Sequence, residues 1–325
     1  MMGLGHPLSF LLVLLLVASL VQVQCHDIPN TWEARPFHSM LALIQPDPVL
    51  LKYHKGPLLK GNITLHILWY GNFPKTHRSI ILDFIQSLHS AHHNHTHPKL
   101  QHSSSPSVHT WWRTTARYRG GPCTLTVGNQ ILANNYSLGK TLKTTQLLAL
   151  ASQNPTRGNA IHVVLTSADV AVEDFCMSRC GTHGSGGAYK RRVAYAWVGN
   201  PVTQCPGECA WPFHRPVYGP PSPPLVPPNG DVGMDGMVIS LATLLAGAVT
   251  NPFGNGYFQG AASAPLEAVS ACTGIFGKGA YPGYAGEVLV DKMTGGSYNA
   301  VGVRGRKFLL PAMWDPVTST CKTLV

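Results

Sequence analysis

The sequence predicts an α/β fold, a single large domain with a mixed central sheet that is flanked by helices and linked by disulfides. An apolar run from Ile63 to Tyr70 precedes a segment from Thr76 to Ala91 whose apolar residues are three and four apart, which indicates a strand and then an amphipathic helix. The 325 residues suffice for one large domain. Eight cysteines follow an apolar N-terminal segment, as is typical of an exported, oxidised chain.

The N-terminus predicts a targeting segment. Residues from Pro7 to Val23 are almost all apolar, but their densest part, Phe10 to Val17, is shorter than the about 20 residues of a transmembrane helix. We expect a secretory signal peptide over residues 1–25, although it carries no Lys or Arg, and a buried helix is the alternative. Residues 26–60 are expected to form an irregular N-terminal arm, and residues 61–325 the α/β domain.

Strand and helix patterns both occur in the first half of that domain. Runs that are rich in apolar, aromatic or β-branched residues predict strands. Ser107 is a good helix cap, and spaced apolar residues follow it. The further predicted strands are 125–132, 160–166 and 193–199, and the further predicted helices are 107–118 and 138–152.

The last third begins with a proline-rich segment. Residues 216–230 contain seven prolines, which excludes a helix or a central strand and predicts an extended surface loop. A helix capped by Asp235 is expected to end before Asn251, and the glycine-rich remainder is expected to form tight turns. The apolar stretch 241–249 is too short and too interrupted for a membrane span.

The charge of +10 arises from scarce carboxylates rather than from dense basic clusters, because only 12% of residues are charged. The longest basic run is 190–192. We expect loose binding of an acidic polymer and no binding of nucleic acid, for which no motif is present. A histidine-rich segment is interpreted as a solvated loop, with metal binding as the alternative. Its histidines are His89, His92, His93, His95, His97 and His102.

The cysteines form two four-residue spacings, Cys176 with Cys180 and Cys205 with Cys209. Metal binding is one interpretation, but export favours disulfides, and Cys272 and Cys321 are further candidates whose pairing stays open. Cleavage after Cys25 leaves seven of the eight cysteines, so one thiol is unpaired or intermolecular.

Three triplets fit the acceptor pattern for N-glycosylation. They begin at Asn62, Asn94 and Asn135, and each has the required hydroxyl residue with no intervening proline. An exported eukaryotic chain would carry glycans there; the alternative is that the triplets are unused surface residues.

Catalytic motifs are scarce. No Gly-x-Ser-x-Gly, Cys-x-x-Cys, phosphate-binding loop or dinucleotide motif occurs, so no cofactor is expected. His183 and His214 lie beside cysteines but are more simply explained as core or turn residues. A glycosidase pair would have to come from a few carboxylates, and nothing selects two of them. These are Asp169, Glu173, Asp174, Asp231 and Asp235.

The predicted helix that follows Asp235 resembles the helix of secreted zinc peptidases that reads Ser-His-Glu-x-x-Glu-Ala-x-Thr-Asp-Pro. The resemblance is carried by Ala248-Val-Thr-Asn-Pro252. It places Thr243 at the metal-binding His, Leu244 at the general-base Glu and Gly247 at the third carboxylate. None of the three can bind zinc or deprotonate water, so this resemblance implies a degenerate zinc-peptidase-like fold without zinc catalysis. An ordinary core helix is the alternative.

The chain as a whole resembles the plant EXORDIUM or phosphate-induced protein family. The similar segments extend from about residue 50 to the end, and the histidine-rich loop and Cys123 depart from the pattern. They include Ile67-Leu-Trp-Tyr-Gly71, Asn135-Tyr-Ser-Leu-Gly-Lys140, Leu165-Thr-Ser-Ala-Asp169, Gln204-Cys-Pro-Gly-Glu-Cys209 and Lys307-Phe-Leu-Leu-Pro-Ala-Met313. The resemblance implies secretion to the apoplast or cell wall and a role in growth, with a link to brassinosteroids, and it brings no catalytic residues.

We therefore expect a secreted, non-enzymatic growth regulator that binds an acidic wall polysaccharide or a cell-surface protein. A secreted hydrolase with an unrecognised active site is the alternative. A structural wall protein is a third hypothesis, which only the proline-rich loop favours.

Overall fold

A computed structural model describes residues 49–89, 106–153, 159–186, 193–217 and 223–325. The predicted signal peptide, the arm up to residue 48, Asn94, the basic run 190–192 and all but His89 of the histidine-rich loop lie outside the described residues. The described residues belong to the unit from Pro48 to Val325.

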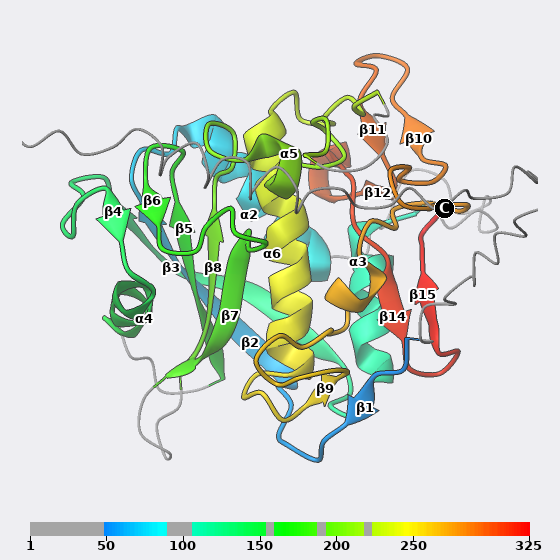
Figure 1. Cartoon of the computed structure of the whole chain (residues 1–325), viewed down its shortest axis with the longest axis horizontal. Helices are drawn as coiled ribbons and strands as arrows, with labels where there is room; N and C mark the ends of the chain where they lie inside the picture. Colours follow the sequence, from blue (N-terminus) through cyan, green and yellow to red (C-terminus); the bar gives the residue numbers. More distant parts are fainter. Residues whose placement is uncertain (1–48, 90–105, 154–158, 187–192, 218–222) are drawn as a thin grey trace, which may run out of the picture. The chain divides into compact units, whose positions relative to one another are not determined.

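A five-stranded mixed sheet forms the centre of this unit (Figure 1), as the sequence predicts. Its order is β3-β2-β5-β8-β7, in which the first four strands are parallel and β7 runs antiparallel to β8 at the edge. The strands are β2 Gly61–Tyr70, β3 Cys123–Ala133, β5 Ala160–Thr166, β7 Gly181–Gly186 and β8 Val193–Gly199.

Helices cover both faces of the sheet, because each face is apolar. Alternate residues of β2, namely Ile63, Leu65 and Ile67, belong to the larger core with α2 and α6, whereas Leu68 and Tyr70 lie in a smaller core with α4. The helices are α2 Lys75–His89, α3 Val108–Trp112, α4 Thr144–Ser152, α5 Pro206–Cys209 and α6 Val232–Thr250.

Two-stranded ribbons and short 3₁₀ helices fill the rest. The paired strands are β1 Lys52–Tyr53 with β9 Tyr257–Phe258, β4 Thr141–Leu142 with β6 Ala171–Val172, β10 Leu289–Val290 with β11 Ser297–Tyr298, β12 Ala300–Val301 with β13 Lys307–Phe308, and β14 Met313–Asp315 with β15 Thr320–Lys322. The 3₁₀ helices are η1 Arg113–Arg117, η3 Ser270–Cys272 and η4 Val303–Gly305.

Some predicted bounds are wrong. The helix predicted over 138–152 begins only at Thr144, because Gly139 has a φ of 81° and the chain then forms β4. The helix predicted over 107–118 does start after the Ser107 cap, but it tightens into η1 from Arg113.

The predicted cap of the apolar helix is also wrong. The side chain of Asp231, not that of Asp235, accepts the Met234 N–H at the start of α6. Asp235 lies in the first turn and accepts hydrogen bonds from the backbone and side chain of Asn229. Burial raises the pKa of Asp235 to about 7. Asp235 is therefore part of a buried hydrogen-bond network with Asn229.

Helix α6 is long and apolar enough to cross a bilayer, but 72% of its membrane-like window is buried inside the unit. It contacts β7 and β8 on one side and α2 on another. Its apolar character is therefore explained by its place in the core.

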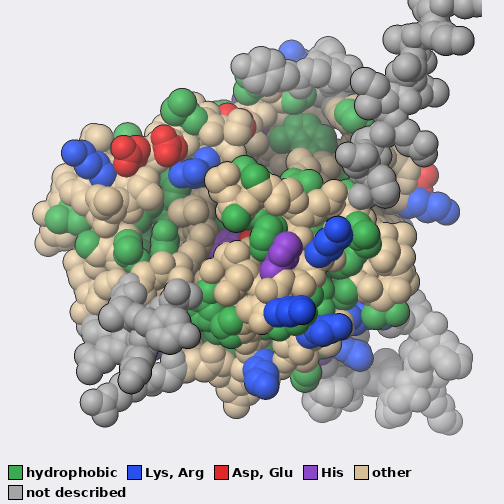
Figure 2. Space-filling view, turned by 60° about the horizontal axis from the view of Figure 1, so that its bottom comes forward, with side chains coloured by type: hydrophobic (Ala, Val, Ile, Leu, Met, Phe, Trp, Pro, Cys, Tyr) green, Lys and Arg blue, Asp and Glu red, His purple; other side chains and the backbone are tan. Residues whose placement is uncertain are grey.

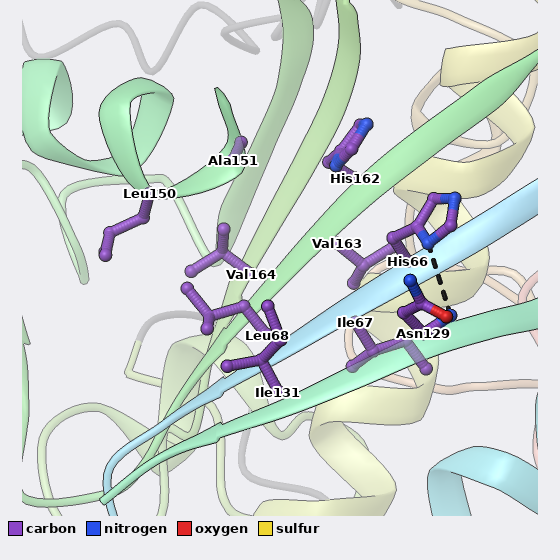
Figure 3. A pocket seen from close by; sticks show the side chains of 10 residues that line it. All are labelled: His66, Ile67, Leu68, Asn129, Ile131, Leu150, Ala151, His162, Val163 and Val164. Carbon is purple, nitrogen blue, oxygen red and sulfur yellow. Dashed lines mark hydrogen bonds between the residues drawn. The ribbon is translucent and has the colours of Figure 1, made fainter. Parts of the chain in front are cut away.

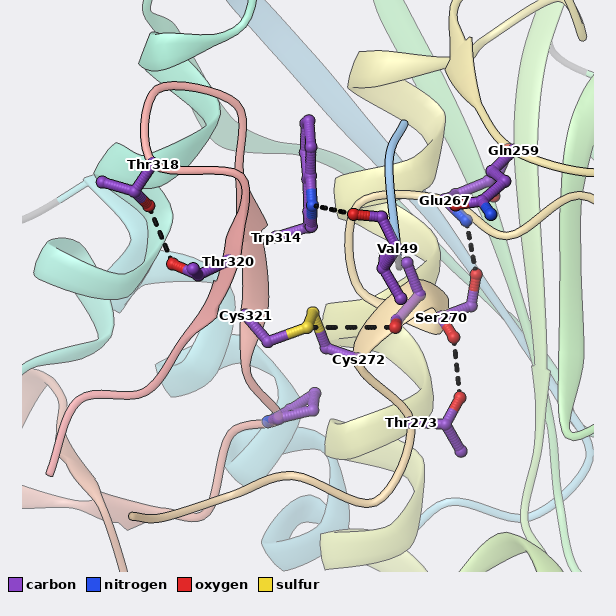
Figure 4. Close-up of a disulfide and its surroundings, with 12 residues drawn as sticks. Val49, Gln259, Glu267, Ser270, Cys272, Thr273, Trp314, Thr318, Thr320 and Cys321 are labelled. Carbon is purple, nitrogen blue, oxygen red and sulfur yellow. Dashed lines mark hydrogen bonds between the residues drawn. A yellow bond between two sulfur atoms is a disulfide. The ribbon is translucent and has the colours of Figure 1, made fainter. Parts of the chain in front are cut away.

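All six candidate cysteines form disulfides, and the pairing that the sequence left open is now defined. Cys176 pairs with Cys205 and Cys180 pairs with Cys209, so the two four-residue spacings are joined in parallel. The third bridge, Cys272–Cys321, fixes the C-terminal ribbon beside η3 (Figure 4). Cys123 is a free, buried thiol.

Candidate functional site

An open cleft of about 760 Å³ lies along β7, α6 and the segment that follows α6. Its walls include residues 178–185, the middle of α6, and the loop 262–265. The cleft therefore contains two of the positions that the peptidase resemblance singled out, Thr243 and Leu244.

The middle of α6 offers no imidazole or carboxylate to this cleft. The Thr243 hydroxyl donates to the Ile239 carbonyl one turn earlier, and Leu244 packs against β7 at Gly181. Gly247 lies under a polar pair: a Cβ atom there would be 2.5 Å from His183 Nε2 and 2.7 Å from Glu267 Oε2. Only glycine fits this position without displacing the pair.

The pair itself joins β7 to the loop before η3. His183 Nε2 and Glu267 Oε2 are 2.6 Å apart, and their side chains are only 10% and 12% exposed. Asn251 Nδ2 donates to the other oxygen, Glu267 Oε1, at 2.6 Å, and Asn251 Oδ1 accepts from the Gly256 N–H. The carboxylate thus orients both an imidazole and the turn that follows α6.

His183 is a histidine with an unused nitrogen. Its Nδ1 is buried and has no hydrogen-bond partner among the described residues. His214, the other histidine considered from the sequence, is exposed and bonds the neighbouring Arg215 carbonyl. The fold does not bring the two histidines together in this cleft. Glu267 carried no local sequence signal, since it lies 84 residues from His183.

Within the described ranges no group of three or more His, Cys, Asp or Glu side chains is arranged to bind a metal ion. Thr243, Leu244 and Gly247 provide neither an imidazole nor a carboxylate. The cleft combines a buried imidazole–carboxylate pair with an apolar floor to which Trp211, Phe276 and Val269 contribute.

A second polar cluster lies where β2 and β5 end. Asp169 accepts from Ser167 Oγ at 2.6 Å and from Tyr136 Oη at 2.8 Å, and Lys140 Nζ is 2.7 Å away. The hydrogen bond from Lys140 holds the pKa of the Asp169 carboxyl well below its usual range. The sequence pointed to Asp169 but not to its partners Tyr136 and Lys140.

The other four candidate carboxylates have structural roles. Glu173 accepts from the Thr144 N–H at the start of α4, which lowers its pKa. Asp174 pairs with Arg179, and Asp231 and Asp235 belong to the start of α6. The structure places no two of the five in the cleft.

Two further histidines, which the sequence did not mark, stack on the other face of the sheet. His66 and His162 lie on β2 and β5 with ring centroids 5.2 Å apart, beside a small cavity of about 20 Å³ (Figure 3). Burial, and then the neighbouring His66, lower the pKa of His162 to about 4. His66 Nδ1 accepts the Asn129 N–H.

Exposed cations gather on one surface that two chain segments form. Gly120 packs on Leu58 and Leu59, and the Arg119 guanidinium lies 5.2 Å from the centre of the Tyr53 ring. Neither 49–60 nor 113–121 contains an acidic residue, and Lys and Arg side chains gather on the face in Figure 2. We call this the basic surface; apart from Arg117, which pairs with Asp315, its exposed cations are Lys52, Lys55, Lys60 and Arg119.

Two of the three glycosylation triplets lie in the described part of the chain. Asn62 is exposed at the start of β2, and Asn135 is exposed in the turn after β3. Both side chains are therefore accessible, whereas Asn94 lies outside the described residues.

Comparisons with known proteins identify the family. The model of the "Phosphate-induced protein 1 conserved region" matches residues 51–324. The chain is 61% identical to Protein EXORDIUM-like 2 of Arabidopsis thaliana over 291 residues, which cover 88% of this chain and 93% of that protein. It is 60% identical to Arabidopsis Protein EXORDIUM over 287 residues, 85% of this chain and 90% of that protein.

A tobacco relative extends this similarity beyond Arabidopsis. Protein PHOSPHATE-INDUCED 1 of Nicotiana tabacum is 57% identical over 297 residues, which cover 88% of this chain and 92% of that protein. No solved structure matches the chain. The identities and the near-complete coverage show that the chain belongs to the plant EXORDIUM and phosphate-induced protein 1 family.

Proposed function

We propose that the protein is secreted to the apoplast and cell wall, where it regulates plant growth by binding a partner rather than by catalysis. The observation that carries this proposal is the absence of an imidazole or carboxylate at Thr243, Leu244 and Gly247, where a zinc peptidase of the resembled kind would need them. Family membership supports the growth role, and the proposal includes a dependence of that role on brassinosteroid.

Three disulfides support export, because such bonds persist in oxidising compartments. The full-length chain with a C-terminal tag should appear in apoplastic wash fluid of plant cells. Glycosidase treatment should reduce its mass if Asn62 and Asn135 carry glycans. Retention of the tagged chain inside the cell would contradict the proposal.

The basic surface supports an acidic wall polysaccharide as the partner. Its exposed cations lie on two adjacent segments that contain no carboxylate, so a polymer of uronic acids would meet little like charge there. Attraction between exposed charges is screened by salt within about 8 Å at physiological ionic strength. Binding should therefore be strong at low salt and should weaken as salt is added.

Immobilised polygalacturonate tests this partner. The variant Lys52→Glu/Lys55→Glu/Arg119→Glu should elute at much lower salt than the unmodified protein. The matched control Lys75→Glu/Lys278→Glu/Lys292→Glu changes the net charge equally at exposed lysines outside the two segments, and it should retain more binding. Equal losses in both variants, or binding that salt does not weaken, would reject the basic surface as the site.

A hydrolase is the second candidate, and the buried His183–Glu267 pair favours it. A carboxylate that orients an imidazole is a common arrangement for a general base. Hydrolysis of peptide or glycan substrates by the purified protein, abolished in His183→Gln, would support this candidate. Hydrolysis that a chelator abolishes would instead overturn our interpretation of positions 243, 244 and 247.

A further inference from the structure

The outer edge of β7 carries unpaired backbone groups. In an antiparallel pair, the residues alternate between those that bond the partner strand and those that point away from it. The Cys180 carbonyl accepts from the Gly199 N–H across to β8, and Gly181 is the residue opposite Val198. The alternation therefore directs the N–H and C=O of Gly181, His183 and Ser185 away from β8.

These outward groups have no backbone partner in another described segment. Within the described part of the chain, their one hydrogen bond with a side chain is a long one of 3.4 Å from Thr182 Oγ1 to the His183 carbonyl. The strand is thus an open edge, and open edges readily pair with a further strand.

The cleft runs along this edge. Residues 178–185 line it without a gap, and consecutive residues of a strand point to opposite faces. Residues that point to the two opposite faces of β7 thus line the same cleft. The cleft therefore lies beside the edge of the strand rather than above one face. Gly181 and Gly184, which lack side chains, leave the backbone accessible there.

We propose that β7 binds an extended segment of a partner polypeptide, which adds to the sheet as a further strand. Outward donors and acceptors recur every second residue, about 6.7 Å apart, and this spacing matches an extended peptide backbone. A polysaccharide has no such alternating row of amides. The apolar floor, to which Trp211, Phe276 and Val269 contribute, favours a peptide with apolar side chains on alternate residues.

His183 adds a polar group to the same site. Its side chain is only 10% exposed, and its buried Nδ1 lacks a partner among the described residues. The backbone of the same residue faces outward along the edge, so a bound peptide would lie beside this histidine. The site goes beyond the proposed polysaccharide binding, and it uses none of the residues of the basic surface.

Panning of a phage-displayed library of linear heptapeptides against the purified full-length mature protein tests the proposal. Peptides with alternating apolar residues should be enriched. Ser185→Pro removes an N–H that does not bond β8, so it should weaken the binding of a selected synthetic peptide at least about tenfold. The matched control Ser185→Ala retains the N–H and should bind within about twofold of the unmodified protein.

Methylation of the peptide gives a second test that does not alter the protein. In an added strand, only alternate amides face β7. N-methylation of one alternate set should abolish binding, while methylation of the other set should be tolerated. Absence of enriched peptides, equal effects of both methylated sets, or full binding by Ser185→Pro would overturn the proposal. Polygalacturonate binding should be measured on the same preparations. Its result tests the basic surface and does not depend on whether β7 binds a peptide.

Discussion

The two faces of the central sheet each bury a histidine, but with opposite partners. His183, on the α6 side, lies 2.6 Å from the carboxylate of Glu267. His162, on the α4 side, stacks on the imidazole of His66. The carboxylate of Glu267 accepts a hydrogen bond from the His183 ring, whereas burial and the neighbouring imidazole lower the pKa of His162. The comparison shows that the interactions of a buried histidine depend on the neighbouring side chain as well as on burial.

The largest expected effect comes from removing the carboxylate. Glu267→Ala leaves His183 Nε2 and Asn251 Nδ2 without their partner in a buried site. The free energy of unfolding should fall by about 2–4 kcal/mol in urea denaturation. The exposed control Glu287→Ala should change it by less than about 0.5 kcal/mol. Similar losses of unfolding free energy in the two variants would contradict a stabilising role for the His183–Glu267 pair.

A smaller effect is expected from crowding the same pair. In Gly247→Ala, the added methyl group would lie 2.5 Å from His183 Nε2, so the pair must move. Alanine is the better helix former by about 1 kcal/mol, but overpacking costs about 1–3 kcal/mol, so we expect a net loss of about 1 kcal/mol. Thermal unfolding measures this loss, with Ser240→Ala on the same helix as the control. A gain in stability in Gly247→Ala would show that the pair is loosely held.

On the α4 side, His162 should make the free energy of unfolding depend on pH in the acid range. The pKa of His162 falls from 6.5 to about 4 on folding, so the unfolded chain binds the proton more readily between these values. The stabilisation is present above pH 6.5 and is lost as the pH falls towards 4, by about 1–3 kcal/mol. His162→Gln should remove this part of the pH dependence. An NMR titration that places the His162 transition near its ordinary pKa would contradict the assignment.

Much of the sheet could be predicted because its central strands are buried on both faces. The runs 63–70, 160–166 and 193–199 are mostly apolar or aromatic, and each lies within or matches an observed strand. β7 could not be predicted, since its residues Gly-Thr-His-Gly-Ser-Gly have low strand propensity and form a strand only by pairing with β8.

The cleft was predictable only in part. The apolar helix follows from the sequence pattern, whereas Thr243, Leu244 and Gly247 were singled out only by the resemblance to zinc peptidases. His183 was one of the histidines considered. Glu267 and Asn251 join it through the tertiary fold, and no local pattern links a loop carboxylate to a strand 84 residues earlier. The pairing of Cys176 with Cys205 likewise depends on how the strands are arranged, which cysteine spacing does not reveal.

The free thiol of Cys123 can be used to detect unfolding of the native protein. The thiol is buried, and burial raises its pKa to about 11, so almost no reactive thiolate exists at neutral pH. Among the described residues, a thiol-specific reagent would therefore label Cys123 only in molecules that have opened. The labelling rate of Cys123 would report how often the domain opens, without any engineered probe.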